Sequence, residues 1–346
     1  MSKVLVIGSG IIGLFTAYTL NCKGYKVDVI DKKRSLGGGI SGNNAGVLHL
    51  IQQPFDSIKS ILTRIGAKKY RELSNLFGYE IYETELYIVG YNLIDKIYLD
   101  IISSILKKEG FNLSRHRNEG ILEPPLTRNI KYFLRIEGYG VVDPIIVLKR
   151  IAEYIGDRGV DIKFSKYEYD SEGYDYIVVA AGPETYNIGE KLDDEVPKHR
   201  YALGVMVNID LNINSIYTHP PNPLKRYTKG GAAIPKQGYT LLGPGFKWVE
   251  SPDEAPSEHD IKQVYKRFEK LFNEPPKILS ISYGVRPINY PKDDFIIRKK
   301  GKYIFTYGID SPGFTAAPII GEIISNMIVD DRRYIELTRD NLERYI

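Results

Sequence analysis

VLVIGSGIIG, from Val4 to Gly13, joins a β-branched apolar run to three glycines, and this stretch decides the fold. A strand, a glycine turn and the start of an apolar helix follow in the order that a dinucleotide-binding site requires. Gly8 permits the tight turn, Gly10 lets the backbone approach a pyrophosphate, and Gly13 lets the helix pack closely on the strand. The N-terminus of the helix then faces the phosphates.

A second apolar strand, Val27 to Ile30, ends at Asp31. This acid follows the glycines by about 20 residues, where a carboxylate can bind ribose hydroxyls. A carboxylate at this place disfavours the 2′-phosphate of NADP. These residues alone leave FAD and NAD both open.

Composition limits the classes of function. The 346 residues suit two lobes, or one domain with a large insertion. The 47 basic and 43 acidic residues form no long single-sign run, so we expect no nucleic-acid partner. The single cysteine, Cys22, excludes an internal disulfide, a cysteine-based zinc site and an iron–sulfur cluster held by this chain alone, and no metal is expected. A cytoplasmic setting fits, and glycines break the uncharged run of residues 4–22, so we expect no membrane span.

Four segments in a fixed order carry a family resemblance. They are GNNAGVLH at Gly42–His49, GYGVVDP at Gly138–Pro144, YDYIVVAAGP at Tyr174–Pro183 and YGIDSPGFTAAP at Tyr307–Pro318. With the glycine turn, they make nearly the whole chain similar to the D-amino-acid-oxidase-like superfamily of FAD-dependent oxidoreductases. The resemblance implies FAD as the cofactor and places the Gly42–His49 loop beside the flavin ring.

The glycine turn, the acidic strand end and the resemblance together give the expected cofactor residues. They are Gly8, Gly10, Ile11, Gly13, Asp31, Lys32, Asn43, Asn44, Ala45, Gly46, Ala181, Gly182, Gly308, Gly313, Phe314 and Thr315. A helix is expected to begin near Phe314, and its free N–H groups suit the electron-rich edge of a reduced flavin. The two asparagines bond flavin or substrate, or merely form a turn; the residues leave both open.

The predicted fold class is α/β, with two interleaved lobes. A Rossmann-like FAD-binding lobe is expected from residues 1–75, 141–200 and 284–346, and a substrate lobe with a mixed or antiparallel sheet from residues 76–140 and 201–283. Asp143 and Pro144 open a helix with apolar positions at Ile146, Val147, Ile151 and Ile155. Residues 257–260 form a capping box, and we expect the helix after it to pack on the substrate-lobe sheet rather than on a membrane.

Hydride transfer to flavin also needs a base and a cation for an anionic substrate. Arg286 is the candidate cation, because the family places a substrate-anchoring arginine in a matching G-x-R-P segment; a structural ion pair is the alternative. His49 is the candidate base or flavin-side hydrogen-bond partner, or else a plain loop histidine. Tyr283 and Lys229 are further substrate-binding candidates. For Tyr283 the alternative is a role in core packing. Lys229 belongs to a cluster with Lys225, Arg226 and Lys236, and the alternative for this cluster is a solvent-exposed basic face.

Within the superfamily, NNAGVLH, LLGP, YGVRPI and IDSPGFTAAP look most like FAD-dependent glycerol-3-phosphate dehydrogenases. The resemblance implies oxidation of glycerol 3-phosphate to dihydroxyacetone phosphate, with a quinone or other carrier as electron acceptor. Oxidation of a 2-hydroxy acid such as 2-hydroxyglutarate, or of an amino acid, is the alternative. An NAD-dependent dehydrogenase and a flavoprotein subunit that serves chiefly as an assembly partner are alternatives from other classes. A peripheral contact with a membrane or a partner subunit stays open.

Overall fold

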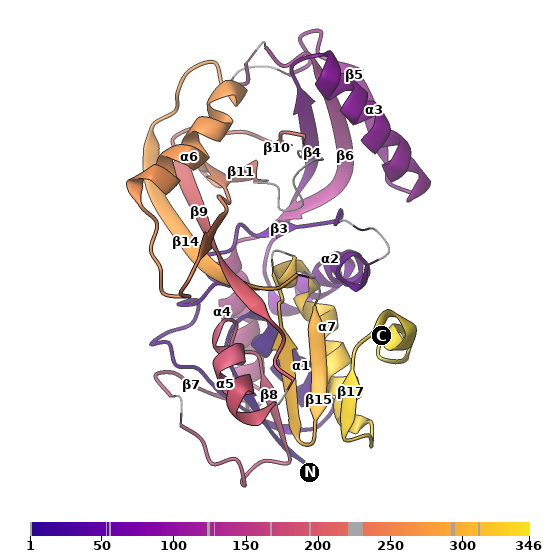
Figure 1. The fold of residues 1–346 in the computed structure, drawn as a ribbon, viewed down its shortest axis with the longest axis vertical. Coiled ribbons are helices and arrows are strands. Elements are labelled where there is room, and N and C mark those ends of the chain that lie inside the picture. The colour runs from indigo at the N-terminus through magenta and orange to yellow at the C-terminus, as the bar shows by residue number, and fades with distance from the viewer. Residues whose placement is uncertain are drawn as a thin grey trace.

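The computed structural model describes residues 2–52, 54, 57–122, 125–127, 129–166, 168–193, 195–220, 231–291, 295–310 and 312–346. Two sheets form opposite ends of the molecule, and both chain termini lie at the end of the first sheet (Figure 1). No helix among these residues is long and apolar enough to cross a membrane.

The first sheet has the strand order β17-β15-β16-β8-β1-β2-β7. Its five parallel strands are β7 (Asp161–Lys163), β2 (Lys26–Ile30), β1 (Lys3–Ile7), β8 (Tyr176–Val179) and β16 (Tyr303–Tyr307). Strands β15 (Ile296–Lys300) and β17 (Tyr334–Glu336) extend it antiparallel at one edge. The central strands are continuous apolar runs because both of their faces are buried.

Helices pack around the first sheet. They are α1 (Ile11–Cys22), α2 (Ile58–Phe77), α4 (Pro144–Gly156), α5 (Glu184–Leu192) and α7 (Gly313–Val329), with a short 3₁₀ helix η2 (Arg339–Arg344) near the C-terminus. The backbones of α1 and α7 approach closely at Gly321, where a Cβ would come 2.8 Å from the Phe15 carbonyl. Helix α7 is apolar on every side because it is almost wholly buried.

The start of α4 confirms the predicted N-cap, since the Asp143 carboxylate accepts hydrogen bonds from the backbone N–H groups of Ile145 and Ile146. Of the apolar positions expected in this helix, Val147, Ile151 and Ile155 are buried in the core, whereas Ile146 is 47% exposed.

The second sheet is mixed. Its order is β13 (Lys247–Val249), β9 (His199–Ile209), β12 (Tyr239–Gly243), β11 (Ala232–Lys236), β10 (Ile216–Thr218), β4 (Tyr82–Gly90), β6 (Tyr132–Val141) and β3 (Val47–Leu48), with β14 (Ile278–Asn289) paired to β9 and β5 (Leu113–Arg117) to β6. Only the β10–β4 pair among these is parallel. The predicted fold class, α/β with a mixed sheet in the second lobe, is therefore confirmed.

Helices α3 (Leu93–Lys108) and α6 (Glu258–Phe268) belong to the second sheet, and a 3₁₀ turn η1 (Glu269–Leu271) follows α6. The capping box is present: the Ser257 hydroxyl accepts from the Asp260 N–H, and the Asp260 carboxylate accepts from the Ser257 N–H. Val264 and Phe268 pack against β9. Helix α6 thus packs on the second sheet through one face, as expected.

The two lobes are joined through shared strands. β9 and β14 are long paired strands that extend from the second sheet toward the first lobe (Figure 1), and β3, which falls within residues 1–75, pairs with β6 of the second sheet. Because β9 and β14 pass through the expected boundaries near residues 200 and 284, the division into two lobes at those residues stays a prediction.

Lys299 of β15 holds the end of α7. Its buried ammonium donates to the carbonyls of Met327 (3.0 Å), Ile328 (3.4 Å) and Asp330. These carbonyls have no partner within the helix, so the ammonium satisfies acceptors that the end of any helix leaves open.

We predict that Lys299→Met lowers the free energy of unfolding by about 1–3 kcal/mol, because the methionine fills the space but leaves those carbonyls without their donor. Urea unfolding followed by circular dichroism measures the loss. Lys26→Met, at an exposed position of β2, is the control and should change stability by less than about 0.5 kcal/mol. Equal stability of the two variants would contradict the capping role.

Candidate active site

A cavity of about 1770 Å³ is lined by residues of both sheets. Binding sites for small ligands usually enclose about 300–1,000 Å³. The cavity therefore has room for an extended cofactor and a substrate together. It lies beyond the carboxyl ends of β1 and β8, where parallel α/β sheets bind nucleotides.

The turn between β1 and α1 accepts only glycine at two positions. Gly8 has φ +110°, and a Cβ on it would lie 2.4 Å from the carbonyl oxygen of Ala180. A Cβ on Gly13 would lie 1.8 Å from the carbonyl oxygen of Gly8. Gly8, Gly10 and Ile11 line the cavity, whereas Gly13 faces the turn and lets the helix pack against it.

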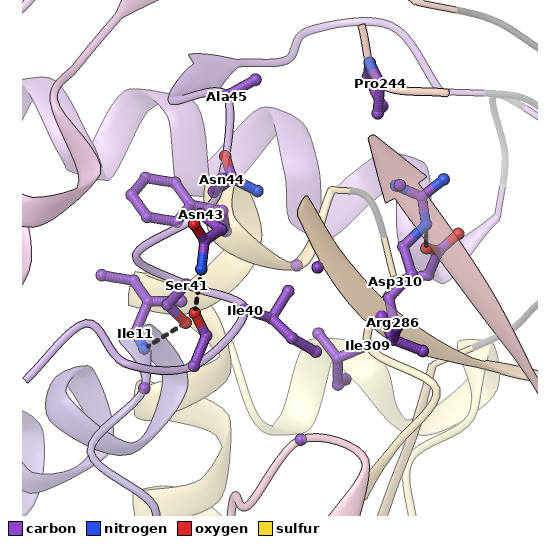
Figure 2. Close-up of a pocket in the computed structure, with 18 of the residues that line it drawn as sticks. Ile11, Ile40, Ser41, Asn43, Asn44, Ala45, Pro244, Arg286, Ile309 and Asp310 are labelled. Atoms are coloured by element: carbon purple, nitrogen blue, oxygen red, sulfur yellow. Dashed lines mark hydrogen bonds and ion pairs between the residues drawn. The ribbon is translucent and has the colours of Figure 1, made fainter. Parts of the chain in front are cut away.

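Two serines that the sequence reasoning missed complete this turn. The Ser41 hydroxyl accepts the N–H of Ile11 at 3.0 Å (Figure 2), and the Asp31 carboxylate accepts from the Ser9 N–H at 2.8 Å and the Ser9 hydroxyl at 2.7 Å. Asp31 also accepts from the Lys33 N–H at 2.8 Å. A carboxylate has about four acceptor sites, so Asp31 is held in place and still has capacity for a ribose hydroxyl.

Lys32 lines the same end of the cavity. Its ammonium lies 2.5 Å from the carboxylate of Glu184, at the start of α5. Ala181 and Gly182 precede α5 and also line the cavity, with Gly182 at φ +60° and the Ala181 N–H bonded to the Thr185 hydroxyl at 3.1 Å. The ion pair of Lys32 with Glu184 therefore links the end of β2 to the start of α5 at the cavity wall.

The Asn43–Gly46 loop is built by its own side chains. The Asn44 side-chain oxygen accepts the Gly46 N–H at 2.8 Å, and the Asn43 amide donates to the Gly39 carbonyl at 3.2 Å. Gly46 has φ +71°, and a Cβ there would meet the Val142 carbonyl at 2.0 Å. The turn-forming role is thus present. Asn43, Asn44 and Ala45 also line one wall of the cavity (Figure 2), so their contact with a ligand stays a prediction.

His49 lines the cavity and is tied to the N-terminus of α7. Its backbone N–H donates to the Thr315 hydroxyl at 3.2 Å, and that hydroxyl donates to the Val47 carbonyl at 3.1 Å. Thr315 is buried behind the wall and supports the loop. Burial lowers the pKa of His49 to about 4, so its imidazole is neutral at pH 7. No residue that the structure describes hydrogen-bonds to this imidazole.

Arg286 lies on the opposite wall and is held by Asp310 (Figure 2). The Arg286 Nε is 2.7 Å from Asp310 Oδ1, while the Lys59 ammonium lies 3.6 Å from Asp310 Oδ2. The guanidinium also lies over the Phe246 ring, 5.8 Å from its centroid. Sequence reasoning missed Asp310 and Lys59, because a single acid in a loop and a single lysine on a helix carry no spacing signal.

The remaining predicted residues lie in different surroundings. Gly313 and Phe314 line the cavity at the start of α7, and Tyr283 lines it from β14 with 41% of its surface exposed. Gly308, at φ +66°, does not line it; a Cβ there would meet the Asn289 amide at 2.2 Å. Lys229, with Lys225 and Arg226, lies outside the described residues.

Three further basic groups near the cavity are half-buried. Lys236 donates to the Val142 carbonyl at 3.1 Å, and burial lowers the pKa of this lysine to about 8. Arg267 of α6 and His219 line the cavity next to Pro244, and burial lowers the pKa of both. Sequence reasoning missed Arg267, because the helical periodicity of α6 marks its apolar face and does not distinguish this arginine from the exposed lysines.

Comparison with known proteins agrees with this arrangement. A family model described as FAD dependent oxidoreductase (DAO) matches residues 3–327. Glycerol 3-phosphate oxidase of Mycoplasma genitalium is 25% identical over 92% of each chain, and mitochondrial L-2-hydroxyglutarate dehydrogenase of Arabidopsis thaliana is 24% identical over 93% of this chain and 82% of its own. The structure of dithionite-reduced L-alpha-glycerophosphate oxidase from Mycoplasma pneumoniae with FAD bound has a TM-score of 0.83, 22% identity and 95% coverage of both chains.

The chain belongs to the DAO family of FAD-dependent oxidoreductases, and FAD is its cofactor. The residues fit this group. Gly8 and Gly13 let strand, turn and helix approach without side chains, Asp31 offers a fixed carboxylate to a ribose, and the cavity continues from that turn to the Asn43–His49 loop.

We predict that Gly13→Ala weakens FAD binding about tenfold or more, because the new methyl group would push α1 away from the turn of Gly8. The FAD content of purified protein and a titration of the apoprotein measure this loss. Gly156→Ala is the control, because a Cβ there meets nothing within 4 Å. Wild-type FAD affinity in Gly13→Ala would contradict the close-packing role of this glycine.

Proposed function

We propose that this FAD-dependent oxidoreductase oxidises glycerol 3-phosphate to dihydroxyacetone phosphate. The observation that carries the proposal is the pairing, in one cavity, of a held cation, Arg286, with a neutral histidine, His49. Mycoplasma relatives of nearly the same length that are named glycerol 3-phosphate oxidases support this substrate.

Arg286 is the group that we assign to the phosphate of the substrate. Its Nε forms an ion pair with Asp310 at 2.7 Å, and its side chain lines the cavity. A guanidinium held by one edge presents the rest of its donors in a fixed direction, which suits bidentate binding of phosphate or carboxylate. Asp310 therefore acts on the substrate through Arg286.

His49 is the group that we assign to the proton of the substrate hydroxyl. FAD, when bound, accepts the hydride from the substrate carbon. The neutral imidazole accepts the hydroxyl proton, so the C–H and O–H bonds break while the C=O bond forms. Because burial keeps the pKa of His49 near 4, the base is already deprotonated at neutral pH. Its backbone bond to Thr315 keeps it at the cavity wall.

A 2-hydroxy acid such as 2-hydroxyglutarate is the second candidate substrate. The Arabidopsis relative of this name supports it, and Arg286 can bind a carboxylate as well as a phosphate. The electron acceptor has two candidates as well. The sequence resemblance implies a quinone or other carrier, while the name oxidase of the Mycoplasma relatives favours molecular oxygen.

We predict that anaerobic addition of glycerol 3-phosphate bleaches the flavin absorbance of the purified protein within seconds. L-2-hydroxyglutarate, D-2-hydroxyglutarate and a set of amino acids, added one at a time, should leave it oxidised. Bleaching by one of these acids instead would replace glycerol 3-phosphate as the substrate. Reoxidation in air with formation of hydrogen peroxide would identify oxygen as an acceptor, and reoxidation only by a quinone would identify a carrier.

We predict that His49→Gln lowers kcat/KM by about 10²–10⁴-fold while FAD stays bound, because the amide cannot take the proton. In the wild type, His49 is deprotonated above its pKa of about 4, so its activity limb falls below pH 5 and not near 6.5. A pH profile of both proteins measures this limb, which should be missing from the variant. A fall in activity at the same pH in the wild type and the variant would instead report titration of the substrate phosphate.

We predict that Arg286→Lys raises KM by about 10-fold or more, because lysine keeps the charge but not the bidentate grip. Steady-state kinetics with the reacting substrate measures this change. Arg150→Lys is the control, at an exposed position of α4 away from the cavity, where we expect a change of less than about threefold. An unchanged KM in Arg286→Lys would leave Arg286 with the structural ion-pair role alone.

A further inference from the structure

Helix α3 is apolar on two opposite faces. Its inner face packs Leu99, Ile102 and Leu106 against the second sheet. Its outer face carries five apolar side chains at helical spacing, here called the outer stripe: Leu93 (67% exposed), Ile94 (79%), Ile97 (59%), Ile101 (54%) and Ile105 (38%). Single exposed apolar residues are ordinary, but a continuous stripe of this kind marks an interaction surface.

The position of α3 suits a broad partner. The helix lies along the outside of the second lobe, with the sheet on one side only (Figure 1). From Leu93 to Ile105 the stripe is roughly 18 Å long and about 10 Å wide. That area is well below the ~800 Å² that each chain buries in a stable protein complex. A bilayer surface, unlike a protein partner, can bind one exposed apolar helix without additional contact area on the protein.

Positive charge remains beside the stripe. The Asp100 carboxylate is paired with Lys96 at 2.9 Å and Arg115 at 2.8 Å, and Glu109 with Arg64 at 3.5 Å. The flanking cations Lys107, Lys108 and Arg117 form no ion pair with a residue that the structure describes, and all three are exposed. Asp95, in the first turn of α3, is half-buried and accepts the Tyr91 N–H, so the unpaired charge at the C-terminal end of the stripe is positive and complementary to anionic lipid headgroups.

We propose that α3 docks the enzyme on an anionic membrane surface. The helix lies in the plane of the headgroups, with the outer stripe in the acyl boundary and the flanking lysines and arginine against the headgroups. No described helix is long and apolar enough to span, which agrees with a helix that lies on the membrane. The proposal does not depend on which substrate is oxidised.

Docking would place the membrane next to the active-site cavity. Ile102 and Leu106, on the inner face of α3, line that cavity together with Leu86 and Ile88 of β4. One helix diameter, about 10–12 Å, therefore separates the outer stripe from the cavity wall.

The test is co-flotation of the purified holoenzyme with vesicles of phosphatidylcholine alone or mixed with equal phosphatidylglycerol. We expect about fivefold more enzyme on the anionic vesicles, and a clear decrease when sodium chloride is raised from about 50 mM to about 500 mM. Ile94→Ser combined with Ile101→Ser should lose at least about fivefold of this binding. FAD content and thermal stability should stay at wild-type values because both residues are exposed.

Ile278→Ser combined with Leu279→Ser is the matched control, because these β14 side chains are 42% and 50% exposed in the same lobe. It should float like the wild type. Flotation with neither vesicle, or equal flotation of the stripe variant and the wild type, would overturn the proposal. So would a wild-type dimer in light scattering that the stripe variant converts to a monomer, since the stripe would then bind a second copy of the chain.

Discussion

The close approach of backbone to backbone at the β1–α1 turn is the constraint on which the rest of the structure depends. Neither glycine has space for a side chain, because Gly8 lies against the carbonyl of Ala180, just after β8, and Gly13 lies against the carbonyl of Gly8. This contact fixes the direction of α1, and α7 packs on α1 through Gly321. The N–H groups that a nucleotide needs are therefore placed by packing of the first lobe.

The second lobe depends on the same contact through α7. The N-terminus of α7 holds Thr315, and Thr315 holds the loop of Val47 and His49, which pairs as β3 with the sheet of the other lobe. The candidate base is thus attached to the first lobe by its hydrogen bonds and to the second by its strand pairing. Burial at this junction is also what lowers the pKa of His49.

On the cavity wall opposite His49, the charged side chains form ion pairs. Arg286 comes from β14 and Lys59 from α2, so the carboxylate of Asp310, in the loop before α7, pairs with two cations from two separate elements. An isolated buried charge is costly, and the shared carboxylate stabilises both cations while it limits how the guanidinium can turn.

The sequence by itself determined the parts that depend on neighbours along the chain. Glycine spacing and an apolar strand gave the nucleotide turn, Asp31 followed at the end of the next strand, and the capping box gave the start of α6. Family motifs added FAD, which the family match supports. Each of these features needs only a short range of residues, so its pattern can be read directly.

Tertiary structure alone decided which distant residues meet. Ser41 reaches Ile11 across 30 positions, and Asp310 reaches Lys59 across the fold, because helix packing and not spacing sets these contacts. Whether Asn44 forms a turn was open in the sequence, and its bond to the Gly46 N–H decided it. The exposed apolar face of α3 could not be predicted either. The helix has apolar residues on two faces, and only the structure shows which face packs on the sheet and which one is exposed.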